Sequence, residues 1–381
     1  MHRRLASSWP ILLLAVAVGL LLAPSCARDH GLGIETTSAT STGSSATGGG
    51  TAGSTGTGGN GGATTGMGAG GAGGAITTTT AGSGGAGAGE PQGPTQLTIV
   101  NGVNDYDAIR ICFLPFPAGD DAALPWPSDA AGLPFAKAVV VKPIATAVPA
   151  NVDVRPHIIA GDLTQIVGKT CGQVLALAAM DPSPIVVTKL AVLPAQVFTS
   201  DRSLLLAPIG CLGGPGHDGP TATLACGFSY TEATPTATIV ALGMSRKNDP
   251  FHMSFQVVNA ATAMQPSDVQ LRPGFDMSTD VLLAKNVSTG EISPKPPSMM
   301  LTLADLGSLD KVKVETFLPM QQQMFLTSSI PLDEAFAHGT VPMVDFDDGA
   351  GLVLIAVGAY PGVDPGGIWH KLTFTMVKAD P

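Results

Sequence analysis

A long stretch near the N-terminus contains almost nothing that could form a hydrophobic core. Between Thr36 and Gly89 the chain has no charged or aromatic side chain, and its large apolar residues there are Met67 and Ile76. Glycine raises the backbone entropy of the unfolded chain, and Ser, Thr and Ala bury little surface. We therefore predict that residues 27–95 form a disordered tether with an end-to-end distance of about 45 Å. The folded part then lies in residues 96–381.

The first 26 residues have the pattern of a bacterial export signal that ends at a lipid-modified cysteine. Arg3 and Arg4 precede the apolar run Ile11–Leu22, which is shorter than the roughly 20 residues that a membrane-spanning helix needs. The sequence Ala23-Pro24-Ser25-Cys26 follows and is similar to a lipobox, with Ala in place of the usual Leu. We predict a signal peptide over residues 1–26, with lipidation at Cys26.

Ordinary secretion is the alternative, because Ser25-Cys26-Ala27 also fits a conventional cleavage site and would leave Arg28 as the first residue. The cysteine count favours lipidation. If Cys26 carries lipid, four of the five cysteines remain, an even set that suits two disulfides in an oxidising compartment. The aspartate that retains many bacterial lipoproteins at the inner membrane is absent beside Cys26. We therefore predict a lipid-anchored protein at the outer membrane or cell surface.

The net charge limits the kinds of partner. Removal of the signal deletes two of the 19 basic residues and none of the 29 acidic ones, which takes the net charge from −10 to about −12. A strongly acidic chain disfavours nucleic acid as a partner. The expected partners are the membrane, through the lipid anchor, and an extracellular protein or glycan.

The folded part has the pattern of an all-β protein. Short apolar runs rich in Val, Ile, Leu and Thr recur between Pro, Gly, Asn and Asp, as is typical of an antiparallel sandwich. These runs are Leu97–Val103, Ala138–Val141, Ile185–Val192, Ser203–Ile209, Thr236–Leu242, Phe251–Asn259, Gly351–Val357 and Leu372–Val377. Helical patterning is confined to Thr170–Met180, with Thr170 as its cap, and to a short turn at Pro331–Phe336.

Two pairs of segments match in the same order along the chain. LTIVNGVNDYDAIRICFLP from Leu97 aligns with FQVVNAATAMQPSDVQLRPG from Phe255, and SLLLAPIGCLGG from Ser203 aligns with GLVLIAVGAYPG from Gly351. Collinear matches of this kind indicate an internal duplication, although β-proteins also reuse such strings by chance. We predict two sandwich units, at 96–248 and 249–381.

The repeated segment resembles the opening of a bacterial cell-surface domain family of unknown function. Members begin with an alternating strand, a His-Ala-Ser-Pro-Asp-like turn and a second alternating strand. The sequences Val257-Val258-Asn259-Ala260-Ala261 and Asp268-Val269-Gln270-Leu271 echo this pattern, with Asn259 in place of the family's His. The resemblance implies tandem Ig-like sandwiches on an exported, often lipid-anchored protein. It brings no catalytic residues.

The four remaining cysteines suit disulfides rather than a metal site. Cys211 and Cys226 bracket a Gly/Pro-rich loop of a size that a disulfide stabilises, by about 3 kcal/mol. We favour Cys211 with Cys226 and Cys112 with Cys171, and the other two connectivities stay open. The sequence has no CxxC motif, so ligation of a metal by these thiols is disfavoured.

Two polar clusters could carry chemistry. His217-Asp218 lies between glycines in the loop from Cys211 to Cys226, but no nucleophile is evident, so we expect an exposed polar turn. Asp345, Asp347 and Asp348 could offer oxygen ligands to Ca²⁺, but their spacing fits no EF-hand, so a solvated turn is the favoured interpretation.

The remaining motifs are weaker. Ser308 and Lys311 satisfy S-x-x-K without the S-D-N or K-T-G sequences of penicillin-binding enzymes. We expect Trp126 and Trp369 to pack in loops or the core rather than to stack on a ligand. The sequence therefore predicts a non-enzymatic surface protein without a cofactor or a bound metal, with an exported hydrolase or a periplasmic solute-binding protein as the alternatives.

Overall fold

The computed structural model describes residues 96–117, 121–198, 203–262, 265–275, 280–320, 323–359 and 366–379, together with the two-residue strand β1, Thr77–Thr78. The predicted signal peptide, Cys26 and the rest of the tether lie outside these residues. β1 pairs in parallel with Val240 and Ala241 of β10 (Thr238–Met244). At these two positions, therefore, the chain departs from the unstructured tether that the sequence predicts.

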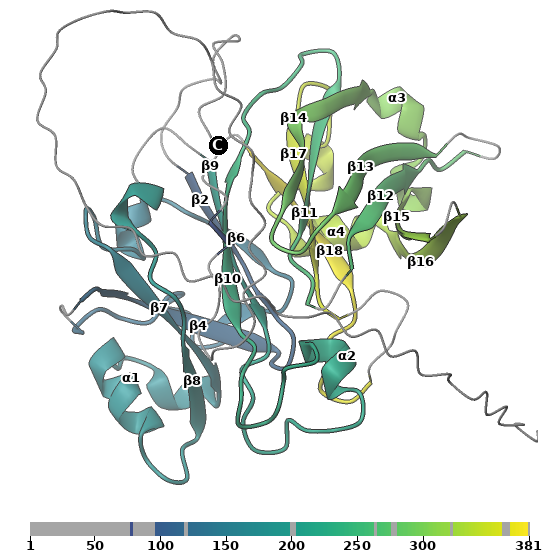
Figure 1. Ribbon diagram of the computed structural model, residues 1–381. Coiled ribbons are helices and arrows are strands. Elements are labelled where there is room, and N and C mark those ends of the chain that lie inside the picture. Colours follow the sequence, from purple (N-terminus) through teal and green to yellow (C-terminus); the bar gives the residue numbers. More distant parts are fainter. Residues whose placement is uncertain are drawn as a thin grey trace, which may run out of the picture. The chain divides into compact units, whose positions relative to one another are not determined.

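The first half of the folded part forms two sheets (Figure 1). The first central sheet has the order β10, β9 (Ser203–Gly210), β2 (Gln96–Val100) and β6 (Ala138–Val141), and β3 (Gly102–Val103) also pairs with β9. The first outer sheet has the order β5 (Leu133–Pro134), β4 (Ala108–Pro115), β7 (Val154–Gly161) and β8 (Ile185–Lys189).

The second half also forms two sheets. The second central sheet has the order β14 (Ile292–Leu301), β11 (Met253–Asn259), β17 (Gly351–Val357) and β18 (Thr373–Lys378). The second outer sheet has the order β13 (Val281–Val287), β12 (Ser267–Arg272), β15 (Lys313–Met320) and β16 (Gln323–Pro331).

The two halves follow the same pairing scheme in the same sequence order. In each, the first long strand pairs in parallel with a late strand, β2 with β9 and β11 with β17. Figure 1 shows this as blue β2 beside teal β9, and green β11 beside yellow β17. Each central sheet therefore contains both parallel and antiparallel pairs, and the prediction of a fully antiparallel sandwich is wrong at these two pairs. Both halves belong to one compact unit, and the domain boundary near residue 248 stays a prediction.

An asparagine at the end of the first long strand makes the same hydrogen bonds in each half. Asn101 Nδ2 donates to the carbonyl oxygen of Leu133 at 2.9 Å, and its Oδ1 accepts from the backbone N–H of Val103 at 3.0 Å. Asn259 donates to the oxygen of Val287 at 3.0 Å and accepts from the N–H of Ala261 at 3.2 Å. Both side chains thus link the central sheet to the equivalent strand of the outer sheet, β5 or β13.

Three apolar layers hold the sheets together. Side chains between the first central and first outer sheets form one layer, and those between the second central and second outer sheets form another. The third lies between the two central sheets and includes Leu205, Ile209, Val353 and Ile355. The central sheets are thus covered on both faces, which explains why β9 and β17 are buried along their whole length.

The helices are short. α1 (Cys171–Ala178) begins at a capping box, in which Thr170 Oγ1 accepts from the N–H of Gln173 and the Gln173 side chain accepts from the N–H of Thr170. The predicted cap is therefore confirmed. The other helices are α2 (Ala222–Cys226), α3 (Leu303–Leu306), α4 (Leu332–His338) and the 3-10 turns Ile144–Thr146, Leu163–Ile166, Ala195–Val197, Leu309–Lys311 and Met343–Asp345. Within the described residues no helix has the length and apolarity to cross a membrane.

Candidate functional site

Both disulfides join the cysteines that the sequence analysis favoured. Cys112 of β4 bonds to Cys171, the first residue of α1, with a Cα–Cα distance of 5.9 Å. Cys211, directly after β9, bonds to Cys226 at the end of α2, at 5.4 Å. The first disulfide attaches α1 to the outer face of its sheet, and the second closes the loop that contains His217. Two disulfides in the folded part indicate an exported protein, because the cytosol keeps such thiols reduced.

The loop around His217 packs against a group of side chains that we call the His217 cluster: Asp105, Tyr106, His217, Tyr230 and Trp369. Asp105 is 2% exposed. Its carboxylate accepts from the N–H groups of Leu212 at 2.9 Å and Gly213 at 2.8 Å, and it lies 3.2 Å from His217 Nδ1. A buried carboxylate is stable when it is satisfied in this way.

Aromatic rings enclose the histidine. The Tyr106 ring stacks on His217 with centroids 4.4 Å apart, and Trp369 presents an edge at 6.3 Å. Tyr106 Oη donates to the oxygen of Gly213 at 2.8 Å, and Tyr230 Oη donates to the oxygen of His217 at 2.6 Å. Burial, followed by the charge of Asp105, raises the pKa of both phenols, so they remain protonated donors.

The prediction of an exposed turn at His217-Asp218 is therefore wrong for His217 and right for Asp218. Asp218 is exposed, whereas His217 is half-buried against Asp105, a residue far away in the sequence. The side-chain hydrogen bonds described for Asp105, Tyr106 and Tyr230 all end on residues 212–217. The contact with Asp105 could orient the His217 imidazole for general-base chemistry, and the same hydrogen bonds fix the loop.

The other residues that the sequence singled out are used in packing or local turns. Trp369 is 7% exposed and packs with the Cys211–Cys226 disulfide, and Trp126 packs at the edge of the first core. Asp348 accepts a hydrogen bond from the N–H of Leu303 at 2.7 Å. Asp345 and Asp347 are exposed. The part of the chain that the structure describes has no group of three or more His, Cys, Asp or Glu side chains that could hold a metal ion.

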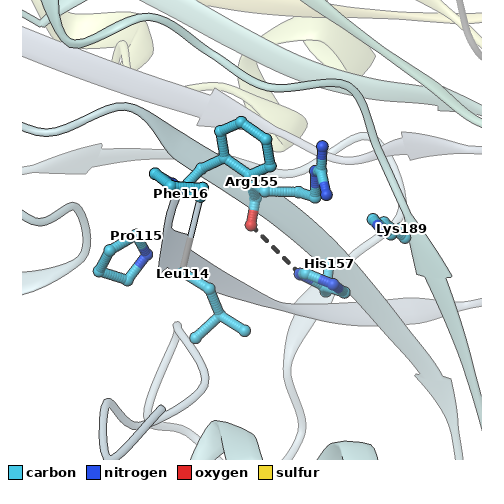
Figure 2. A pocket seen from close by; sticks show the side chains of 7 residues that line it. Leu114, Pro115, Phe116, Arg155, His157 and Lys189 are labelled. Carbon is cyan, nitrogen blue, oxygen red and sulfur yellow. Dashed lines mark hydrogen bonds between the residues drawn. The ribbon is translucent and has the colours of Figure 1, made fainter. Parts of the chain in front are cut away.

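The sequence analysis missed a pocket on the outer face of the first outer sheet, which we call the sheet pocket. It has a volume of about 220 Å³ and is lined by Leu114, Pro115, Phe116, Pro117, Arg155, His157 and Lys189. Figure 2 shows Leu114, Pro115 and Phe116 on one side, with the guanidinium of Arg155, His157 and Lys189 on the other. These residues come from β4, β7, β8 and the two residues that follow β4, and the sequence contains no motif that would group them.

Comparisons with known proteins add little. No protein-family model matches the chain, so the resemblance to a cell-surface domain family stays a prediction. No curated protein matches it either. Among solved structures, a fimbrilin from Porphyromonas gingivalis W83 aligns over 74% of this chain and 96% of its own, with 8% identity and a TM-score of 0.14. A similarity of this size supports no conclusion about fold or function.

Proposed function

We propose that this chain is an exported surface protein, held in a membrane by lipid on Cys26, whose folded part has a non-catalytic binding or structural role. The observation that carries the proposal is the pair of disulfides, because they need an oxidising compartment. The lipobox-like sequence before Cys26 supports the anchor, at the outer membrane or cell surface. Secretion without an anchor is the alternative.

The fold supports a scaffold rather than a catalytic centre. The shared pairing scheme of the two halves supports a tandem of Ig-like sandwiches, at 96–248 and 249–381. The His217 cluster supports a structural role for that loop, since its buried carboxylate and both phenols bind the loop itself.

Fractionation of cells that carry single variants tests the anchor. The native protein should remain with the membrane fraction, and Cys26→Ala should release it into a soluble fraction, because each buried methylene of the acyl chains contributes about 0.8 kcal/mol to anchoring. Ser25→Ala is the matched control, since it keeps a small residue before Cys26 and should leave the protein on the membrane. A native protein in the soluble fraction, or Cys26→Ala still on the membrane, would contradict the anchor.

An exported hydrolase is the second candidate, and the contact between Asp105 and His217 is the observation that favours it. This candidate predicts hydrolysis of ester or amide substrates that His217→Gln abolishes while thermal stability is retained. The structural role predicts the opposite: no hydrolysis by the native protein, and a lower melting temperature for His217→Gln. A periplasmic solute-binding protein would have a deep pocket between the two units, whereas here the two central sheets meet in a packed apolar layer.

A further inference from the structure

The sheet pocket lies where the outer face of the first outer sheet is left uncovered. Arg155, His157 and Ile159 alternate along β7, so their side chains share one face of the sheet. Ile159 packs in an apolar cluster with the Cys112–Cys171 disulfide and Val174 of α1. The face therefore has a covered end under α1 and an open end at Arg155 and His157.

Strand register brings three basic side chains together at this open end. His157 is directly opposite Lys189 of β8, and Arg155 is directly opposite Leu114 of β4. Basic residues are fewer than acidic ones in this chain, 19 against 29. Even so, Arg155, His157 and Lys189 form no ion pair with any residue in the described part of the chain. The positive charges of Arg155 and Lys189 are left to face the pocket.

Arg155 is held in place before any ligand arrives. Its guanidinium lies 4.1 Å from the centroid of the Phe116 ring, a cation–π contact that orients the planar group. Its Nε is buried and has no hydrogen-bond partner among the described residues. His157 Nδ1 lies 3.2 Å from the backbone oxygen of Arg155, which orients the imidazole as well. A planar guanidinium held in this way offers its terminal N–H groups to an anion in the pocket.

Apart from the basic side chains, the lining of the pocket is apolar. Leu114, Pro115 and Phe116 form it, as Figure 2 shows. A ligand therefore needs an anionic group on one side and a compact apolar or ring-shaped body on the other. The volume of about 220 Å³ is below the range of about 300 to 1,000 Å³ that is typical of drug-sized ligands. A single ring fits this size.

We propose that the sheet pocket binds a small carboxylate carried on a single ring, with the carboxylate on Arg155 and Lys189 and the ring against Leu114 and Phe116. A planar guanidinium forms paired hydrogen bonds with a carboxylate, and Lys189 adds a second charge. The ring could belong to a free aromatic acid or to an acidic sugar of an envelope polysaccharide. This inference rests on the binding role proposed above and adds the chemical class of the ligand.

Calorimetric titration and saturation-transfer NMR on the full mature chain in detergent micelles test the proposal. Benzoate and glucuronate are the probes, and benzyl alcohol and glucose are their neutral counterparts. At least one carboxylate should bind, with a dissociation constant of about 0.1 to 1 mM at low salt. Neither neutral counterpart should bind. Binding of benzoate alone identifies a free aromatic acid as the source, and binding of glucuronate alone identifies an acidic sugar.

Three variants locate the binding. Arg155→Gln and Lys189→Gln should each raise the dissociation constant of the carboxylate by at least about tenfold, because each removes a charge-assisted hydrogen bond. Lys189 is exposed at the end of β8, so its replacement tests the pocket even if Arg155→Gln disturbs folding. Lys285→Gln is the matched control, since it removes the same charge from an exposed position on β13 and should leave the affinity unchanged.

Three results would overturn the inference: no binding of either carboxylate, equal binding of the neutral counterparts, or an equal loss in Lys285→Gln. These results are independent of the anchor. A soluble native protein in the fractionation experiment would refute the lipid on Cys26 and leave the pocket untouched.

Discussion

Replacing the two equivalent asparagines by alanine should destabilise the protein by similar amounts. Asn101→Ala leaves the buried carbonyl of Leu133 and the N–H of Val103 without their side-chain partner, and Asn259→Ala does the same to Val287 and Ala261. Each lost hydrogen bond costs about 1 kcal/mol net, and a buried group left unsatisfied costs about 1 to 3 kcal/mol. We therefore expect each substitution to lower the free energy of unfolding by about 2 to 4 kcal/mol, out of a typical total of 5 to 15 kcal/mol.

Urea denaturation, followed by circular dichroism and by the fluorescence of Trp126 and Trp369, measures both effects. The apolar layer between the central sheets joins the two halves, so each variant should unfold in one transition seen by both probes. Asn248→Ala is the control, because Asn248 is exposed and donates one hydrogen bond, to Gly349 at 3.1 Å; its loss should cost about 0.5 kcal/mol or less. If replacing either buried asparagine lowers the free energy of unfolding no more than Asn248→Ala does, the assignment of equivalent structural roles is refuted.

Three further perturbations have expected outcomes. Removing the Cys112–Cys171 disulfide, which closes 59 residues, should lower the free energy of unfolding by about 4 kcal/mol. Removing the Cys211–Cys226 disulfide, which closes 15 residues, should lower it by about 3 kcal/mol. The first variant should therefore have the lower melting temperature, and the reverse order would contradict the loop-entropy argument. Gly210 has a φ of 90°, and a Cβ there would lie 2.6 Å from the backbone oxygen of Thr236. Gly210→Ala should therefore lower stability by at least about 1 to 3 kcal/mol, whereas at Gly243 nothing lies within 4 Å of such a Cβ and alanine should be tolerated. Burial lowers the pKa of His157, so the unfolded chain takes up a proton here more readily than the folded one. The stability of the native protein should be fully retained well above the ordinary pKa of 6.5 and should fall as the pH drops below it. His157→Gln lacks this proton uptake, so its melting temperature should fall less between pH 7 and pH 5 than that of the native protein. An equal fall in both proteins would contradict this.

Strands that carry a strong local signal could be predicted from the sequence. Ala138–Val141 and Gly351–Val357 are found at the predicted bounds, because a run of apolar residues between turn residues leaves little choice. The helix after Thr170 was predicted for the same local reason, since its cap is formed by neighbours in the sequence.

Strands of mixed character were missed. β14 contains Pro294, Pro296 and Pro297, which argue against a strand, yet it lies at the edge of its sheet, where a missing N–H costs little. Two-sided burial of the central sheets was not predicted either. An apolar run is compatible with a strand that is buried on one face or on both. Here the second face is buried because the central sheet of the other half packs against it.

The sites depended on contacts that are distant in sequence. His217 looked like a loop residue because its partner, Asp105, lies before β4 and gives no local signal. Arg155 lies on β7 and Lys189 on β8, and the pairing of these strands places both residues in the lining of one pocket. Neither group of residues has a signal in the local sequence, so both are identified only in the folded chain.

Intact-mass measurement on protein extracted from its own membranes, with and without reductant, tests the central claim most directly. The proposed function predicts a chain that begins at acylated Cys26 and gains about four daltons on reduction, two for each disulfide. A chain that begins unmodified at Arg28, or that shows no mass increase on reduction, would contradict the anchored, disulfide-bonded surface protein.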